Sequence, residues 1–203
     1  MNQQVTTLFL LDNVDSFTYN LVDELRTLNL DIKVYRNTVS ANALFERMQE
    51  QATKGPVLLM LSPGPGAPSE AGCMPELLKK VHGVFPVIGI CLGHQLLGLA
   101  LGMKTIKMKF GHHGANHPVK DLDSNRVFIT SQNHGFTIDS KSIPEDVKIT
   151  HLSLFDETIQ GIETSDKRCF SFQGHPEASP GPQEIQELFD KFLTVVKSNA
   201  KKK

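Results

Sequence analysis

The sequence has almost no net charge, and this absence narrows the classes of partner. Its 203 residues carry 21 lysines and arginines against 22 acids, a formal net charge of −1. A protein that binds a polyanion needs a basic surface, so nucleic acid is not an expected partner. The N-terminal "MNQQVTTLFLLD" lacks the features of a secretory signal, and no uninterrupted apolar run is long enough to cross a bilayer. We expect a cytoplasmic protein that does not bind membranes.

Cysteine is also scarce. Cys73, Cys91 and Cys169 are widely spaced and odd in number, which argues against a disulfide framework and suits a reducing compartment. The hydrophobic content of 39% is enough for one sizeable core. We therefore expect residues 1–203 to form a single domain.

The first half of the sequence alternates apolar runs rich in Val, Ile and Leu with segments of helical period. This alternation predicts parallel strands joined by crossover helices. The expected strands are 7–12, 31–36, 56–62 and 86–91, and the expected helices are 17–28, 40–51, 74–82 and 94–102. After residue 104 the period shortens, and the expected strands are 105–110, 126–132, 147–153, 158–163 and 168–173, before a last helix near 183–198. The predicted fold is α/β, an open, mostly parallel sheet flanked by helices, with antiparallel strands added late.

The segment "GICLG" places Cys91 between Gly89 and Gly93, where a strand passes into a helix. G-x-C-x-G in this context has the form of a nucleophile elbow, because glycines let a tight, strained turn close. The start of the helix would raise the thiolate fraction, and the Leu92 N–H could point at a developing oxyanion. Taken alone, the segment leaves a buried structural cysteine as the alternative.

A partner for this cysteine lies in "FQGHPEASPGP" near the C-terminus. His175 and Glu177 are two residues apart, so in an extended segment both side chains project to the same side. A base and an orienting carboxylate need this arrangement, and with Cys91 they form a nucleophile triad. In isolation His175 would more simply be a hydrogen-bonded structural histidine.

In this order, "LSPGPG", "GICLGHQ" and "GHPEA" resemble the class I glutamine amidotransferases, which remove ammonia from glutamine and pass it to a synthase. The resemblance implies that Cys91 attacks the glutamine amide, His175 transfers the proton and Glu177 orients it. The N–H groups of Gly64 and Leu92 would hold the oxyanion. It also implies a set of residues that hold the glutamine, namely Gln95 and the backbone of Asn133, Gly135 and Phe136. No cofactor is expected.

The two halves resemble different branches of this family. Residues 8–95, with "LLDNVDSFTYNL", resemble the glutaminase component of anthranilate synthase, component II. Residues 91–185, with "SQNHGF" and "FSFQGHPEASPGP", resemble the glutaminase domain of the carbamoyl-phosphate synthetase small chain. The sequence starts directly at the glutaminase strand, without the domain that precedes it in the carbamoyl branch. The expected partner is therefore the chorismate-using anthranilate synthase component I, and the alternative is the carbamoyl-phosphate synthetase large subunit.

Two departures from these branches matter. The anthranilate branch has a different set of residues where this sequence has "QNHGF". Residues 132–136 therefore do not preserve the rim that the active site has in that branch. Glu157, in "LFDET", stands at a turn where the carbamoyl branch has glycine. If the turn requires a positive φ, Glu157 strains the backbone.

A metal site is not expected. His112, His113 and His117 are close together in "GHHGANH", but no nearby cysteine or carboxylate completes a recognisable ligand set. We expect a packed loop there. Two other functions stay open at this point: a stand-alone cysteine hydrolase of γ-glutamyl compounds, and a catalytically silent regulatory subunit. The intact Cys91, His175 and Glu177 argue against the second, and a glutaminase assay separates it from an enzyme.

Overall fold

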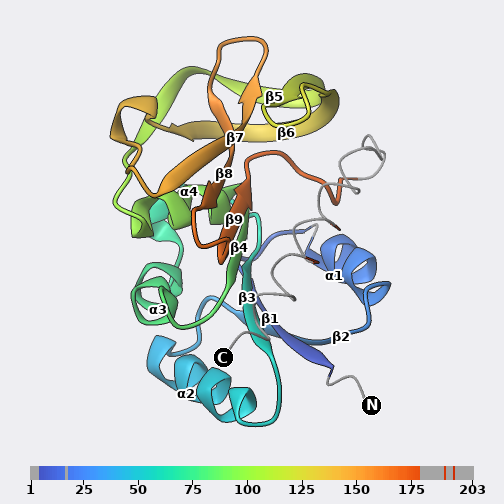
Figure 1. The fold of residues 1–203 in the computed structure, drawn as a ribbon, viewed down its shortest axis with the longest axis vertical. Coiled ribbons are helices and arrows are strands. Elements are labelled where there is room, and N and C mark those ends of the chain that lie inside the picture. Colours follow the sequence, from blue (N-terminus) through green and yellow to red (C-terminus); the bar gives the residue numbers. More distant parts are fainter. Residues whose placement is uncertain (1–4, 17, 179–189, 191–193, 195–203) are drawn as a thin grey trace.

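The computed structural model describes residues 5–16, 18–178, 190 and 194, and a nine-stranded sheet forms its centre (Figure 1). The strand order is β2-β1-β3-β4-β9-β8-β7-β5-β6. The strands are β1 Thr6–Asp12, β2 Leu30–Arg36, β3 Val57–Leu61, β4 Val87–Ile90, β5 Thr105–Asp121, β6 Val127–Ile138, β7 Val147–Ser153, β8 Ile159–Thr164 and β9 Cys169–Phe172. The helices are α1 Thr18–Arg26, α2 Ala41–Ala52, α3 Met74–Val81 and α4 Leu92–Ala100.

The sheet changes direction between its two halves, as predicted. Strands β2, β1, β3, β4 and β9 pair in parallel, whereas β9 with β8, β8 with β7, β7 with β5 and β5 with β6 pair antiparallel. The predicted α/β fold with late antiparallel strands is confirmed. Of the last predicted helix, 183–198, the structure describes residues 190 and 194 alone, and both are helical; Phe17, at the start of the first predicted helix, lies outside the described residues.

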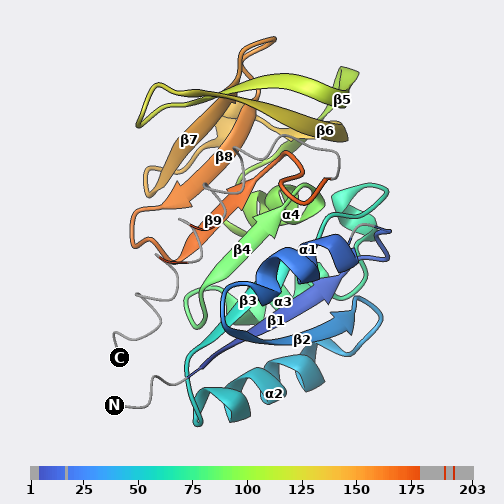
Figure 2. The same ribbon diagram turned by 90° about the vertical axis from the view of Figure 1, so that its right-hand side faces the viewer.

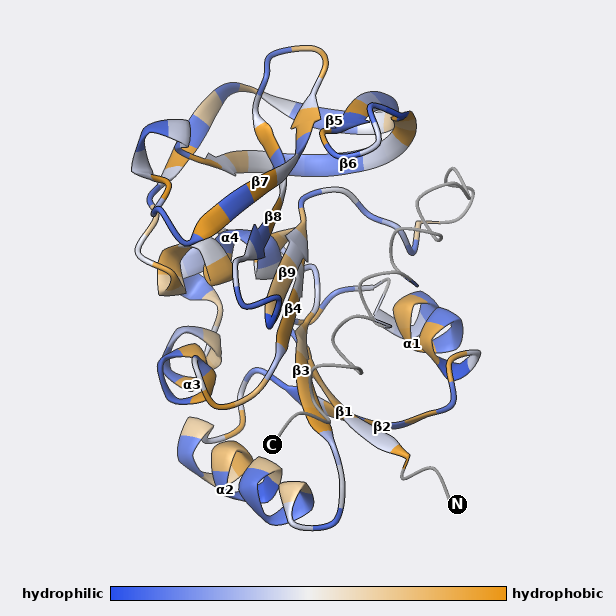
Figure 3. Cartoon of the chain, viewed as in Figure 1, coloured by the Kyte–Doolittle hydropathy of each residue, from blue (hydrophilic) through white to orange (hydrophobic). Residues whose placement is uncertain are grey.

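Helices cover both faces of the parallel half (Figure 2). On β1, Leu8 and Leu10 pack on the same side as α1, whereas Phe9 and Leu11 pack with α2 and α3. A strand buried on both faces reads as a continuous apolar run, which is why "TLFLLD" has no polar alternation. The hydropathy colouring shows the same division, with apolar central strands and helices that are polar on the outside (Figure 3). Among the described helices, none is long and apolar enough to span a membrane.

The histidine-rich segment is not the packed loop that we expected. "GHHGANH" lies within β5, paired with β6 from His112↔His134 to His117↔Thr130. The register shifts between Lys107 and His112 and again between Gly114 and His117. Bulges of this kind accommodate glycines within a strand, and Gly114 has a φ of 128°. Glycine and polar residues signalled a loop, but pairing with β6 outweighs that local preference.

Glu157 adopts a φ of 59°, so the strain expected at this exposed turn is present. Its N–H donates to the carbonyl of Ser153 at 3.0 Å. A side chain in this left-handed region costs about 1–2 kcal/mol, and glycine avoids that cost.

We predict that Glu157→Gly stabilises the protein, because relief of this strain exceeds the extra chain entropy that glycine loses. The free energy of unfolding in urea should rise by about 0.5–1 kcal/mol. The matched control is Glu157→Ala, which removes the same carboxylate but keeps a Cβ. Equal unfolding free energies for the two variants would show that the strain does not exceed the entropy cost of glycine, and would contradict the prediction.

Candidate active site

Cys91 lies at a strained turn between β4 and α4, with φ 52° and ψ −105°. Two glycines permit this turn. A Cβ on Gly89 would lie 2.3 Å from the carbonyl oxygen of Gly93, and a Cβ on Gly93 would lie 2.4 Å from that of Leu61. The Cys91 N–H donates to the carbonyl of Phe172 at 2.9 Å, which ties the turn to β9. Strain of this kind persists only where the surrounding structure imposes it.

His175 and Glu177 are paired, but not through an extended segment. Residues 176–177 form a turn, closed by a 3.3 Å hydrogen bond from the N–H of Ala178 to the carbonyl of His175. The expectation of an extended link is therefore wrong, because Pro176 starts a turn here. Nδ1 of His175 nevertheless lies 2.7 Å from Oε1 of Glu177, whose side chain is fully buried.

Neighbouring charges, rather than burial, determine the protonation state of His175. Burial alone would lower the pKa of His175, but the negative charge of a Cys91 thiolate and the carboxylate of Glu177 raise this pKa to about 11. Two anionic neighbours therefore outweigh the cost of burying an imidazolium. The raised pKa of His175 favours its imidazolium form at neutral pH.

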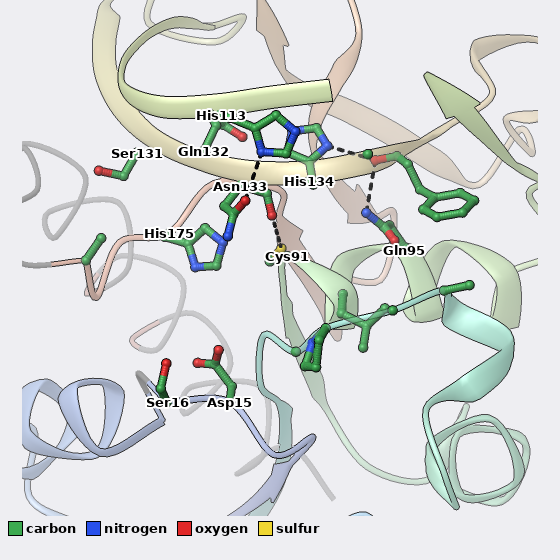
Figure 4. A pocket seen from close by; sticks show the side chains of 18 of the residues that line it. Asp15, Ser16, Cys91, Gln95, His113, Ser131, Gln132, Asn133, His134 and His175 are labelled. Carbon is green, nitrogen blue, oxygen red and sulfur yellow. Dashed lines mark hydrogen bonds between the residues drawn. The ribbon is translucent and has the colours of Figure 1, made fainter. Parts of the chain in front are cut away.

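One pocket of about 920 Å³ brings the sequence-predicted residues together (Figure 4). Its lining includes every predicted site residue except Glu177, which lies behind His175: Gly64, Cys91, Leu92, Gln95, Asn133, Gly135, Phe136 and His175. Asp15 and Ser16 form the opposite wall. The pocket lies at the carboxyl ends of β1, β3, β4 and β9, where ligands bind in open α/β sheets.

The side chain of Asn13 packs against Gly64, a contact that the sequence did not indicate. A Cβ on Gly64 would lie 2.2 Å from Nδ2 of Asn13, so only glycine fits between this side chain and the pocket. Asn13 is buried; its Oδ1 accepts a hydrogen bond from Asn37, and its N–H donates to Ser62 Oγ at 3.0 Å. The ends of β1 and β3 thus position the loop that carries Gly64.

The opposite rim comes from β6. The Cys91 thiol contacts the carbonyl of Asn133, with 4.0 Å between sulfur and oxygen. Nε2 of Gln95 donates to the carbonyl of Phe136 at 3.0 Å, so α4 is tied to the same strand. His134 also lines the pocket, and burial, together with the charges of nearby histidines, lowers its pKa to about 4. It therefore presents a neutral imidazole beside a charged His175.

The histidines of β5 are held by neighbouring side chains. Nε2 of His112 lies 2.9 Å from Oδ2 of Asp156, and its ring lies 5.0 Å from that of His117. His113 Nδ1 lies 2.9 Å from Asn133 Oδ1. In the part of the chain that the structure describes, no group of three or more His, Cys, Asp or Glu side chains is placed to hold a metal ion.

Comparison with known proteins agrees with this geometry. The family described as "Glutamine amidotransferase class-I" matches residues 9–195. The chain belongs to this family. It is 56% identical over 145 residues to the carbamoyl phosphate synthase small chain of Photorhabdus laumondii, with 71% of this chain and 38% of that protein aligned. The small chain of Neisseria meningitidis serogroup A is 55% identical over 151 residues, covering 74% of this chain and 40% of that one.

A solved structure shows the same fold. A glutamine amidotransferase from Thermotoga maritima superposes with a TM-score of 0.69 at 18% identity, covering 98% of this amidotransferase chain and 91% of that one. The chain spans only about two fifths of the length of the curated relatives it matches. These relatives do not support the expected anthranilate synthase assignment. They favour the alternative, the carbamoyl branch.

Gln173, Asn13 and His134 are pocket or pocket-supporting residues that sequence reasoning missed. Gln173 precedes His175 by two positions in "FQGHPE", at the end of a predicted strand, and that place was its one visible signal. Asn13 directly follows β1 in the same way. His134 stands between Asn133 and Gly135, which were named for their backbone alone.

We predict that Gly64→Ala lowers kcat for glutamine hydrolysis by about 10²–10³-fold, the usual effect of losing one oxyanion donor. The added methyl group collides with Asn13 and displaces the loop. The control is Gly83→Ala, at a position where a Cβ meets no atom within 4 Å but the φ of 76° makes alanine cost stability; its kcat should stay near that of the wild type. An unchanged kcat in a folded Gly64→Ala variant would exclude this loop from the oxyanion site.

Proposed function

We propose that this amidotransferase hydrolyses glutamine to glutamate and ammonia through Cys91, His175 and Glu177, and that it delivers the ammonia to a synthase. One observation carries the proposal: a cysteine at a strained strand-to-helix turn shares a pocket with a histidine that is paired to a buried carboxylate. A structural cysteine needs neither the strain nor the ion pair.

In the first half of the reaction the Cys91 thiolate attacks the side-chain amide carbon of glutamine. The carbonyl oxygen becomes an oxyanion, held by the N–H groups of Gly64 and Leu92. Leu92 is the first residue of α4, so its N–H has no acceptor within the helix. The His175 imidazolium then gives its proton to the nitrogen, the C–N bond breaks, and ammonia leaves a γ-glutamyl thioester on Cys91.

In the second half the neutral imidazole of His175 takes a proton from water, which attacks the thioester. The C–S bond breaks, glutamate leaves, and the thiolate–imidazolium pair is restored. Glu177 keeps the proton of Nδ1 in place throughout and stabilises the cation, because its carboxylate lies 2.7 Å away. Gln95 and the backbone of Asn133, Gly135 and Phe136 hold the substrate at the rim.

The reactivity of ammonia and the identity of the relatives both support a synthase as the partner. Ammonia released into water at neutral pH becomes ammonium and loses its nucleophilicity, so a docked synthase with a sheltered path is favoured. Because the relatives named here are carbamoyl phosphate synthase small chains, we propose the large subunit of carbamoyl-phosphate synthetase as that partner. Anthranilate synthase component I stays as the second candidate, supported only by residues 8–95.

We predict that Cys91→Ser abolishes glutamine hydrolysis without changing the fold, because a serine hydroxyl is far harder to ionise at nearly the same volume. His175→Asn should be almost as damaging, and Glu177→Gln should cost about 10²–10⁴-fold in kcat, since part of the imidazole orientation survives. Glutamate release measures activity and circular dichroism checks the fold. Activity near that of the wild type in all three variants would return Cys91 to a structural role.

We also predict that the purified chain has basal glutaminase activity, which the large subunit of carbamoyl-phosphate synthetase stimulates. The experiment mixes the chain in separate reactions with this large subunit or with anthranilate synthase component I, and follows glutamine-dependent product formation. Stimulation by component I only would show that residues 8–95, rather than the rim on β6, select the partner.

A further inference from the structure

A chain of side-chain amides links the rim of the pocket to the sulfur of Cys91. It begins at the backbone carbonyl of Phe136, which can only accept a hydrogen bond. Gln95 must therefore turn its NH₂ group toward this carbonyl, at 3.0 Å. The second hydrogen of that NH₂ group is directed to Oε1 of Gln173, which accepts it with 3.1 Å between nitrogen and oxygen.

These contacts fix the orientation of the second amide. Because Oε1 of Gln173 accepts from Gln95, its Nε2 points the other way, and this nitrogen lies 3.8 Å from Sγ of Cys91. The direction of the N–H toward sulfur is thus imposed by a backbone carbonyl two hydrogen bonds away. Gln173 has no exposed surface, and a buried amide is costly unless it is hydrogen-bonded.

An N–H aimed at sulfur favours the thiolate over the thiol, because the charged form is the stronger acceptor. The carbonyl of Asn133 acts in the opposite sense, since it accepts a proton that only the neutral thiol carries. Gln173 thus provides a neutral hydrogen-bond donor that stabilises the thiolate in addition to the positive charge of His175. It also leaves Oε1 of Gln95 to accept a hydrogen bond from a substrate, such as the ammonium group of an amino acid.

We propose that Gln173 is a positioning residue that stabilises the Cys91 thiolate and fixes the amide of Gln95 for substrate binding. This role rests on the proposed glutaminase function. It goes beyond the triad because one side chain joins the nucleophile to the binding residue. The arrangement also explains a buried glutamine at the end of β9, where an apolar side chain would pack without needing partners.

The test compares three buried glutamines, each changed to methionine, which has similar volume but no amide. Gln173→Met removes both contacts, whereas Gln95→Met removes the substrate-binding amide and the bond that orients Gln173 but keeps the Gln173 amide itself. The matched control is Gln160→Met, because Gln160 is fully buried and its amide is hydrogen-bonded to Gln132 rather than to Cys91. Two readouts are taken: the pH profile of Cys91 alkylation by iodoacetamide, followed by peptide mass spectrometry, and the KM and kcat for glutamine.

In Gln173→Met the alkylation profile should move toward higher pH by about half a unit or more, kcat should fall, and KM should rise several-fold. Gln95→Met should raise KM, and because it also releases the amide of Gln173, it should move the alkylation profile in the same direction by less than Gln173→Met does. Gln160→Met keeps the backbone carbonyl that accepts the Gln173 N–H, so it should leave the alkylation profile unchanged even if it lowers thermal stability. A purely structural Gln173 would instead behave like Gln160.

If Gln173→Met does not fold, Gln173→Asn replaces it, since the shorter amide cannot reach both partners; the same shifts are expected, reduced in size. An unchanged alkylation profile in either folded variant overturns the proposal, and so does failure of both variants to fold, which would assign Gln173 to the fold alone. Because alkylation needs no turnover, these outcomes are distinct from failure of the proposed function, which would appear as a wild-type chain without glutaminase activity.

Discussion

The backbone of Cys91 is held in a conformation that residues with a Cβ rarely adopt, and the rest of the site depends on it. The turn survives because Gly89 and Gly93 let the backbones of β4, α4 and Leu61 touch, and because the Cys91 N–H is bound to Phe172. These restraints come from the fully buried centre of the sheet, where a local change of φ would disturb several strands at once. The core therefore presents the sulfur to the pocket while the α4 terminus supplies an N–H.

The parallel pairing of β4 with β9 brings the second half of the site to this turn. Ile90 lies opposite Phe172, so the residues that follow each strand, Cys91 and Gln173, emerge side by side at the carboxyl ends. The next residues reach β6, where the N–H of His175 donates to the carbonyl of Ser131 at 3.0 Å. Residues far apart in the sequence thus meet because adjacent strands end at the same edge.

Local signals in the sequence were enough for the parts of the fold and site that local chemistry determines. The apolar runs predicted most strands, the glycines around Cys91 predicted the elbow, and the turn at Glu157 has the positive φ that its place suggested. Non-local pairing decided the rest. β5 runs through a histidine-rich segment that reads as a loop, Pro176 turns a segment expected to be extended, and Gln173 gains its contacts only when β9 lies beside β4. The sequence favoured anthranilate synthase component I as the partner, whereas the relatives favour the carbamoyl branch.

Covalent acylation of Cys91 by glutamine is tested most directly by acid quenching during turnover. Wild-type protein is mixed with glutamine, quenched, digested and examined by mass spectrometry, with Cys91→Ser treated in parallel. We expect a γ-glutamyl adduct on the peptide that contains Cys91, lost on treatment with hydroxylamine and absent from the serine variant. Steady glutamate release from the wild type with an adduct on Cys73 or Cys169, or from the serine variant at the same rate, would contradict it.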